Sequence, residues 1–162
     1  MLASFIIAGG LIFNTAGPKG AEAQAESSVV VPVAASAVHV NATAMASLVS
    51  AFRREHGLGP VRVDSSLMNF AKEQARNMAT YNMIGHDVGR SFTERRRSLR
   101  ARVVVENLGA AYGSVAEAFA GWRDSPSHRA NMLDPAMTRL GIAAVPTSNS
   151  YYRVFWALAM AS

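Results

Sequence analysis

Two stretches in the first half of the chain carry apolar residues three and four positions apart, a spacing typical of amphipathic helices. The first begins near Thr43 and ends at Gly57-Leu58-Gly59-Pro60, because glycine and proline favour helix ends. The second follows Asp64, a favoured N-cap residue. The apolar positions are Met45, Leu48, Val49 and Phe52 in the first stretch and Leu67, Phe70, Ala71, Ala75, Met78 and Ala79 in the second.

Capping signals predict three shorter helices further along the chain. Ser91-Phe92-Thr93-Glu94 and Ser114-Val115-Ala116-Glu117 are capping-box patterns, in which serine and glutamate satisfy the first backbone N–H groups of a helix. Ser125-Pro126 is an N-cap and first-turn pair that predicts a helical stretch over His128–Leu133.

Runs of β-branched and aromatic residues predict strands. Val103–Val105 is expected to be a buried strand that ends at Glu106-Asn107, and Leu140–Val145 and Tyr151–Leu158 flank a turn. The last run is apolar on both faces, which predicts a strand between two layers. The alternating aromatic residues Tyr151, Tyr152, Phe155 and Trp156 are interpreted as core. Helices first and a hairpin last favour an α+β fold with a small, mostly antiparallel sheet covered by helices.

The N-terminal residues have a different character. Leu2–Phe13 is an apolar run, followed by glycine and proline and then by small-x-small patterns at Ala21–Ala25. This arrangement is typical of a secretory signal peptide. No basic residue precedes the run, so a short buried helix is the alternative. We expect residues 1–25 to be a signal peptide, residues 26–42 a linker or N-terminal arm, and residues 43–162 one domain.

Composition excludes several classes of protein. The 162 residues contain no cysteine, which rules out a disulfide framework, a thiolate zinc site and a cysteine nucleophile. Half of the residues are hydrophobic, enough to bury a core. No apolar run reaches the roughly 18 residues of a transmembrane helix.

The net charge of +5 has one marked concentration, a group of arginines opposed locally only by Glu94. It could attract an anionic surface, or it could be a solvated helix face. Phe92 is the only aromatic residue interleaved with it, so we expect no nucleic acid partner. The cluster comprises Arg90, Arg95, Arg96, Arg97, Arg100 and Arg102.

Four polar residues stand out as candidates for chemistry: His86, Glu106, Asp124 and His128. All lie in predicted loops or at predicted ends of elements, where functional side chains are common. Two imidazoles and two carboxylates suit a divalent metal such as zinc or acid–base chemistry near neutral pH. Their separation along the chain means that only the fold could bring them together.

Taken together, several segments resemble the CAP superfamily (cysteine-rich secretory protein, antigen 5 and pathogenesis-related 1) in its short bacterial form without cysteine. The resemblance covers about residues 43–159. Its most specific segment is Trp122-x2-Ser125-Pro126-Ser127-His128-Arg129-x-Asn131-Met132-Leu133. The others are Leu48–Leu67 with Arg53 and Gly57–Pro60, Ala71–Ala79, Gly85-His86, Ser91-Phe92 with Arg95, Glu106-Asn107-Leu108 and Leu140–Ala143.

This resemblance implies an α-β-α sandwich with a central antiparallel sheet and a cleft lined by two histidines and two acidic residues. His86 and His128 match the histidines, and Glu106 matches the first acidic residue. The second acidic position falls near Asp124 or Ser125. Ser127 departs from the glycine usual in the bacterial form, which alters backbone freedom before His128.

Because a family resemblance implies a fold better than a reaction, we assign no enzymatic activity. We expect a secreted or periplasmic binding module whose cleft holds a divalent metal, most simply zinc, through His86 and His128. Glu106 would be a third ligand or would orient a histidine. The ligand is unknown and could be a lipid or a component of the cell envelope. The alternatives are a lipid or sterol carrier and a metal-assisted hydrolase of peptides, esters or cell-wall polymers, with Glu106 as general base.

Overall fold

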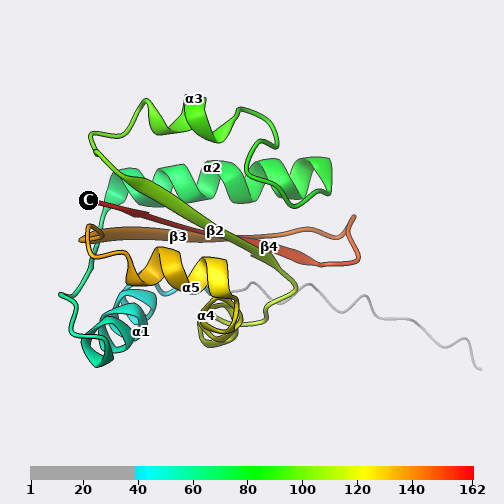
Figure 1. Cartoon of the computed structure of the whole chain (residues 1–162). Coiled ribbons are helices and arrows are strands. Elements are labelled where there is room, and N and C mark those ends of the chain that lie inside the picture. The colour runs from blue at the N-terminus through cyan, green and yellow to red at the C-terminus, as the bar shows by residue number, and fades with distance from the viewer. Residues whose placement is uncertain (1–38) are drawn as a thin grey trace, which may run out of the picture. The chain divides into compact units, whose positions relative to one another are not determined.

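The computed structural model describes residues 39–162, which form four strands and five helices (Figure 1). The sheet has the order β1-β3-β4-β2. Its strands are β1 (Arg62–Val63), β2 (Val104–Ala110), β3 (Arg139–Pro146) and β4 (Val154–Ala161). The helices are α1 (Ala42–Glu55), α2 (Ser65–Tyr81), α3 (Phe92–Arg96), α4 (Val115–Asp124) and α5 (Pro126–Leu133). The predicted signal peptide and most of the predicted arm lie outside the described residues.

The sheet is mostly antiparallel, as predicted. β4 pairs antiparallel with both β3 and β2, and only the two-residue β1 pairs parallel, with β3. Figure 1 shows α2 and α3 on one side of the sheet and α1, α4 and α5 on the other. The fold is therefore an α-β-α sandwich, in which β2 is an edge strand.

The central strand β4 explains the two apolar faces predicted from the sequence. Val154 and Trp156 pack in the core shared with α1, α4 and α5, whereas Phe155 and Ala157 pack in the core shared with α2. Every residue of β4 is buried. This alternation follows from the two-residue period of a strand, and it places helices on both faces.

Tyr151 and Tyr152 do not belong to this core, so their interpretation as core residues is wrong. Tyr151 is 95% exposed and Tyr152 is 39% exposed. Both lie in the turn before β4, because Arg153 adopts a positive φ of 63°. That left-handed conformation breaks the extended backbone, and the strand begins only at Val154.

The predicted helix starts hold with two differences. Ser91 and Glu94 form a complete capping box at α3. At α4, Ser114 accepts from the Glu117 N–H, but the Glu117 carboxylate accepts from Gly113 N instead of closing the box on Ser114 N. Ser125 precedes α5 without a side-chain capping bond, so Pro126 alone provides the sequence signal that the structure uses there.

The strand that carries Glu106 is longer than predicted. β2 runs from Val104 to Ala110, which places Glu106 and Asn107 inside the strand rather than at its end. The β-branched run stops at Val105, but pairing with β4 continues to Ala110 opposite Phe155. Glu106 and Asn107 therefore point to opposite faces of the sheet.

A buried arginine anchors the end of α5. Arg53 of α1 is 1% exposed and donates to the backbone carbonyls of Gly59, Met132, Asp134 and Met137 at 2.8–2.9 Å. These carbonyls belong to the loop after α1 and to the chain leaving α5. The bonds fix α5, which carries His128, against the rest of the domain.

Within residues 39–162 there is no helix with both the length and the hydrophobicity needed to cross a membrane.

Candidate functional site

The first candidate residue, His86, lies in a loop that is held at both ends. The loop leaves α2 through Asn82, whose positive φ of 51° ends the helix. The buried Gln74 side chain of α2 donates to the Gly85 carbonyl, and the Asp87 carboxylate accepts from the Phe92 N–H at 2.8 Å. The ring of His86 is therefore presented from a constrained backbone.

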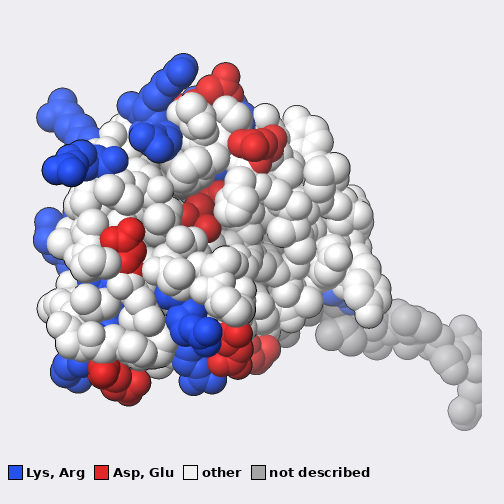
Figure 2. Space-filling view, viewed as in Figure 1, with Lys and Arg blue, Asp and Glu red and all other residues white. Residues whose placement is uncertain are grey.

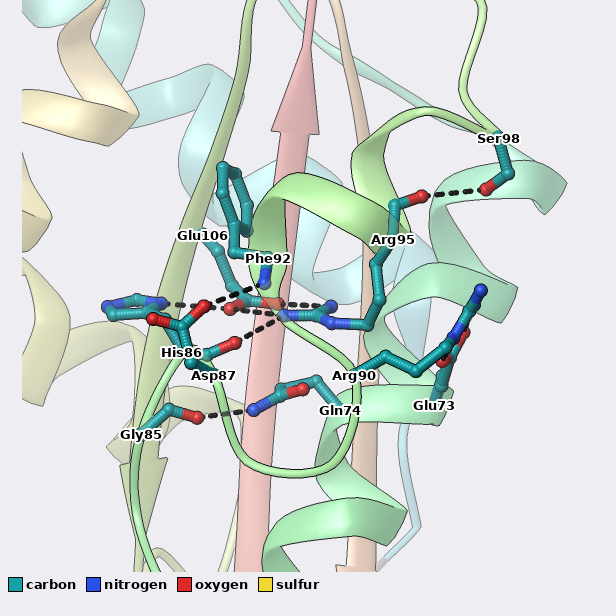
Figure 3. Close-up of polar contacts among 10 residues, drawn as sticks. All are labelled: Glu73, Gln74, Gly85, His86, Asp87, Arg90, Phe92, Arg95, Ser98 and Glu106. Atoms are coloured by element: carbon teal, nitrogen blue, oxygen red, sulfur yellow. Dashed lines mark hydrogen bonds and ion pairs between the residues drawn. The ribbon is translucent and has the colours of Figure 1, made fainter.

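Glu106 of β2 meets Arg95 of α3 in a buried ion pair (Figure 3). Arg95 Nη1 donates to Oε1 at 2.9 Å and Nη2 donates to Oε2 at 3.1 Å. The side chains are 0% and 1% exposed. Because a charge buried without a partner is strongly destabilising, each of these residues needs the other in order to stay buried.

Arg95 is held from several directions. Nη2 also donates to the backbone carbonyl of His86 at 3.0 Å. The guanidinium lies 4.4 Å from the centroid of the Phe70 ring and 5.8 Å from that of Phe92, which adds cation–π attraction. Arg95 thus links α2, α3, β2 and the His86 loop, and its inclusion in the surface cluster of arginines was wrong.

His86 forms the third part of this network. Its Nδ1 lies 2.9 Å from Glu106 Oε2, while the side chain remains 52% exposed. The hydrogen bond to Glu106 raises the pKa of His86 above its ordinary value, against the opposing effect of partial burial. Figure 3 shows the second ring nitrogen pointing away from the carboxylate. The carboxylate therefore orients the ring and leaves Nε2 on its free side.

His128 lies on α5, on the other side of β2. It is half-buried, and burial followed by the charge of His86 lowers its pKa below the ordinary value. A neutral imidazole is therefore favoured at His128.

Two asparagines join α5 to β2 near these rings. Asn107 Nδ2 donates to the His128 carbonyl at 3.0 Å, and Asn131 Nδ2 donates to Asn107 Oδ1 at 2.8 Å. Asn131 Nδ2 also lies 3.4 Å from the Glu106 carbonyl. Sequence reasoning did not assign Asn131 a role, although it belongs to the segment that carries the family resemblance.

These elements surround a cavity of about 410 Å³, which is within the usual range for small-ligand pockets. Polar and apolar side chains both reach it. The lining residues are His86, Asp87, Phe92, Thr93, Val104, Val105, Glu106 and Asn131.

Asp124 is placed away from this cavity. Its side chain is 68% exposed and pairs with Arg123 at 3.0 Å, and it is absent from the cavity lining. The structure brings His86 and Glu106 into contact at the cavity, places His128 on α5 outside the residues that line it, and leaves Asp124 at the end of α4.

A divalent metal fits only part of the predicted ligand set. Residues 39–162 contain no group of three or more histidine, aspartate or glutamate side chains arranged to hold a metal. Both oxygens of Glu106 already accept from Arg95, and Oε2 also bonds to His86. The imidazoles of His86 and His128 have the chemistry for zinc, whereas Glu106 is better placed to orient His86.

The remaining arginines of the cluster are on the surface. Arg90 pairs with Glu73 at 2.8 Å. Figure 2 shows Lys and Arg side chains gathered at the upper left of the face that Figure 1 presents. Within this cluster, the exposed arginines without a carboxylate at ion-pair distance among residues 39–162 are Arg96, Arg97, Arg100 and Arg102.

The three layers and the histidine–glutamate cleft define a small α-β-α sandwich domain with a ligand-sized cavity beside an edge strand. Residues 46–160 match the cysteine-rich secretory protein family, abbreviated CAP. This match spans most of the chain, so the chain belongs to that family, although its sequence contains no cysteine.

Individual relatives agree with this assignment. The chain is 26% identical to the uncharacterized protein YkwD of Bacillus subtilis in an alignment of 144 residues that covers 83% of the chain and 54% of that protein. The chain thus spans about half the length of this curated relative.

Two solved structures share the fold. An extracellular protein with an SCP domain from Bacillus anthracis gives a TM-score of 0.64 at 22% identity, covering 74% of this chain and 39% of that one. An outer surface protein from Borrelia burgdorferi gives 0.65 at 18% identity, covering 74% of this chain and 90% of that one. At these identities the likeness shows the fold alone.

Proposed function

We propose that this chain is an exported, non-enzymatic binding module whose cleft takes its ligand at the His86 ring and can hold a divalent cation there. The observation that carries this proposal is the buried Arg95–Glu106 pair, which fixes a half-exposed imidazole at a cavity. Export is supported by the N-terminal apolar run and by relatives described as extracellular or outer surface proteins.

The cation would be held by His86 Nε2 and by the ring of His128. A carboxylate on the opposite nitrogen of a metal-binding histidine fixes its tautomer and makes it a better ligand, and Glu106 occupies that position at Nδ1. When bound, the cation would supply a positive centre for an anionic or carbonyl group of a ligand. Two protein ligands alone imply modest affinity, with water completing the coordination.

A hydrolase that uses Glu106 as general base is less well supported. A general base must reach the proton that it removes, but the Glu106 side chain is 1% exposed and Arg95 binds both of its oxygens. The lipid-carrier alternative has no specific contact in its favour, since the cavity is lined by apolar residues such as Phe92 and Val105 and also by polar and charged residues such as Asp87 and Asn131.

Zinc titration by calorimetry at pH 7.5 tests this proposal on the full chain. We expect saturable binding that is lost in both His86→Ala and His128→Ala. His56→Ala is the matched control, because His56 follows α1 and its Nδ1 lies 2.9 Å from the Phe52 carbonyl, outside the cleft. Unchanged zinc affinity in the His86→Ala/His128→Ala double variant would refute the metal assignment.

A further inference from the structure

The outer edge of β2 carries backbone groups that the sheet does not use. β2 is an edge strand, paired on one side with β4. In an antiparallel pair, successive residues alternate between bonding to the neighbouring strand and facing away from it. Ser162 N donates to the Val103 carbonyl at 3.2 Å, and Ala111 N donates to the Val154 carbonyl at 3.0 Å. Odd-numbered residues of this segment therefore bond toward β4, and even-numbered residues face outward.

Side-chain contacts confirm this parity. The Leu108 carbonyl accepts from Trp122 Nε1 at 3.0 Å, and the Glu106 carbonyl lies 3.4 Å from Asn131 Nδ2. Both carbonyls therefore point away from β4, toward α4 and α5. The N–H groups of the even-numbered residues point to the same outer side as their carbonyls.

Val104 and Glu106 both line the cavity, and the alternation along the strand turns their N–H groups to its outer edge. Neither N–H donates to an acceptor among residues 39–162 in the hydrogen bonds outside the sheet. The two residues are 8% and 4% exposed. Because backbone N–H groups are strong donors that need an acceptor, these two groups are available to acceptors of a bound molecule.

The spacing of these groups identifies the chemistry of the molecule. Two residues along a strand span about 6.8 Å, too far for one carboxylate or phosphate group to accept from both donors. The Val104 carbonyl lies on the same edge. A donor, an acceptor and a second donor at this repeat match the alternating backbone groups of an extended peptide, which adds to a sheet edge as another strand.

We propose that the β2 edge at Val104 and Glu106 binds a short extended peptide segment as an added strand within the cleft. This proposal rests on the proposed function in that it uses the same cleft, but it does not require the cation. The Asn131 side chain already donates to the Glu106 carbonyl, so the hydrogen bonds between β2 and the added strand would end at Glu106. Side chains of the added strand would alternate between the wall with Phe92 and Thr93 and the wall with Asn131.

The test is an NMR titration of the full chain with acetyl-Thr-Val-Thr-Val-amide in the presence of EDTA. β-branched residues favour the extended conformation. We expect saturable shifts of the Val104 and Glu106 amide signals and at least tenfold slower hydrogen exchange at these two positions. Val105 and Asn107, which bond to β4, serve as internal references that stay unchanged. A control peptide with proline in place of all four residues should fail to bind, because it has no internal amide donor in either register and so cannot pair with the Val104 carbonyl as a strand.

A Val104→Pro variant tests the edge from the protein side. Proline removes an outward N–H that the ladder does not need, and edge strands tolerate it on that side. We expect a folded variant that no longer binds the peptide; if it does not fold, the wild-type exchange measurement decides.

The proposal is overturned if the peptide leaves both amides unaffected, if the proline peptide binds equally well, or if both amides are already protected in the free chain. Because EDTA is present throughout, failure here leaves the zinc result untouched, and failure of zinc binding leaves this result untouched.

Discussion

Replacing Arg95 with methionine tests the structural basis of the cleft. The substitution places an unbranched apolar side chain of similar length between Phe70 and Phe92, and it removes both hydrogen bonds to Glu106. Glu106 then remains as a carboxylate whose side chain is 1% exposed and whose only remaining side-chain partner is His86. Breaking a buried ion pair by removing one partner costs about 3–5 kcal/mol. For a domain of this size, that loss lowers the Tm by about 10–20 °C.

The matched control is Arg96→Met, the next residue of the same helix. Arg96 is exposed and makes no ion pair within the described residues. The free energy of unfolding of the Arg96→Met variant should therefore differ from that of wild type by no more than about 0.5 kcal/mol. In urea denaturation at pH 7.5, the Arg95→Met/Glu106→Met double variant should recover most of the loss, because it leaves no unpaired buried charge.

The loss in Arg95→Met should also be smaller in acid, where a protonated carboxyl is easier to bury than a carboxylate. A stability within about 1 kcal/mol of wild type at pH 7.5 would show that Arg95 and Glu106 do not form the buried pair described above.

Three further predictions follow from individual contacts. NMR titration of the His86 ring should give a pKa above the ordinary value of about 6.5, and Glu106→Gln should lower that pKa; a His86 pKa at the ordinary value would contradict the hydrogen bond to Glu106. Because the folded-state pKa is raised, the stability from this bond is present at acidic pH and is lost as pH rises through the folded-state pKa. Gly141→Ala should destabilise the domain by about 1–3 kcal/mol, because a Cβ there overlaps the backbone of Leu67 and Met68, whereas Gly59→Ala meets nothing within 4 Å and should be nearly neutral. Sedimentation with anionic vesicles should show binding that falls steeply with salt and is lost when Arg96, Arg97, Arg100 and Arg102 are changed to glutamine; equal loss on changing Arg54, Arg62, Arg76 and Arg153, which removes the same charge elsewhere, would argue against a specific surface.

Much of the fold could be predicted because local signals agree with tertiary packing. The two long helices follow their apolar spacing, and the capping box at Ser91 forms as its sequence indicates. β4 is buried on both faces, as its apolar residues require. The end of β2 could not be read from composition, because pairing with β4 rather than β-branched side chains carries the strand through Glu106 and Asn107.

The site could be predicted only in part, since its geometry depends on contacts between distant segments. The resemblance identified His86 and Glu106, which the structure brings together. The local density of positive charge groups Arg95 with the surface arginines, although its side chain is buried. A signal was present, however: Arg95 lies three residues after Phe92, and residues three apart share a helix face. An arginine on the same face as an aromatic core residue indicates a buried partner, and Glu106 is that partner.

The most direct test of the central claim is a crystal structure of the full chain grown with zinc, with anomalous scattering measured at the zinc edge. Our account predicts one peak in the cleft, within bonding distance of His86 Nε2 and the His128 ring, with both oxygens of Glu106 still bound to Arg95. No zinc at the two imidazoles, or zinc bound by Glu106 with Arg95 displaced, would contradict it.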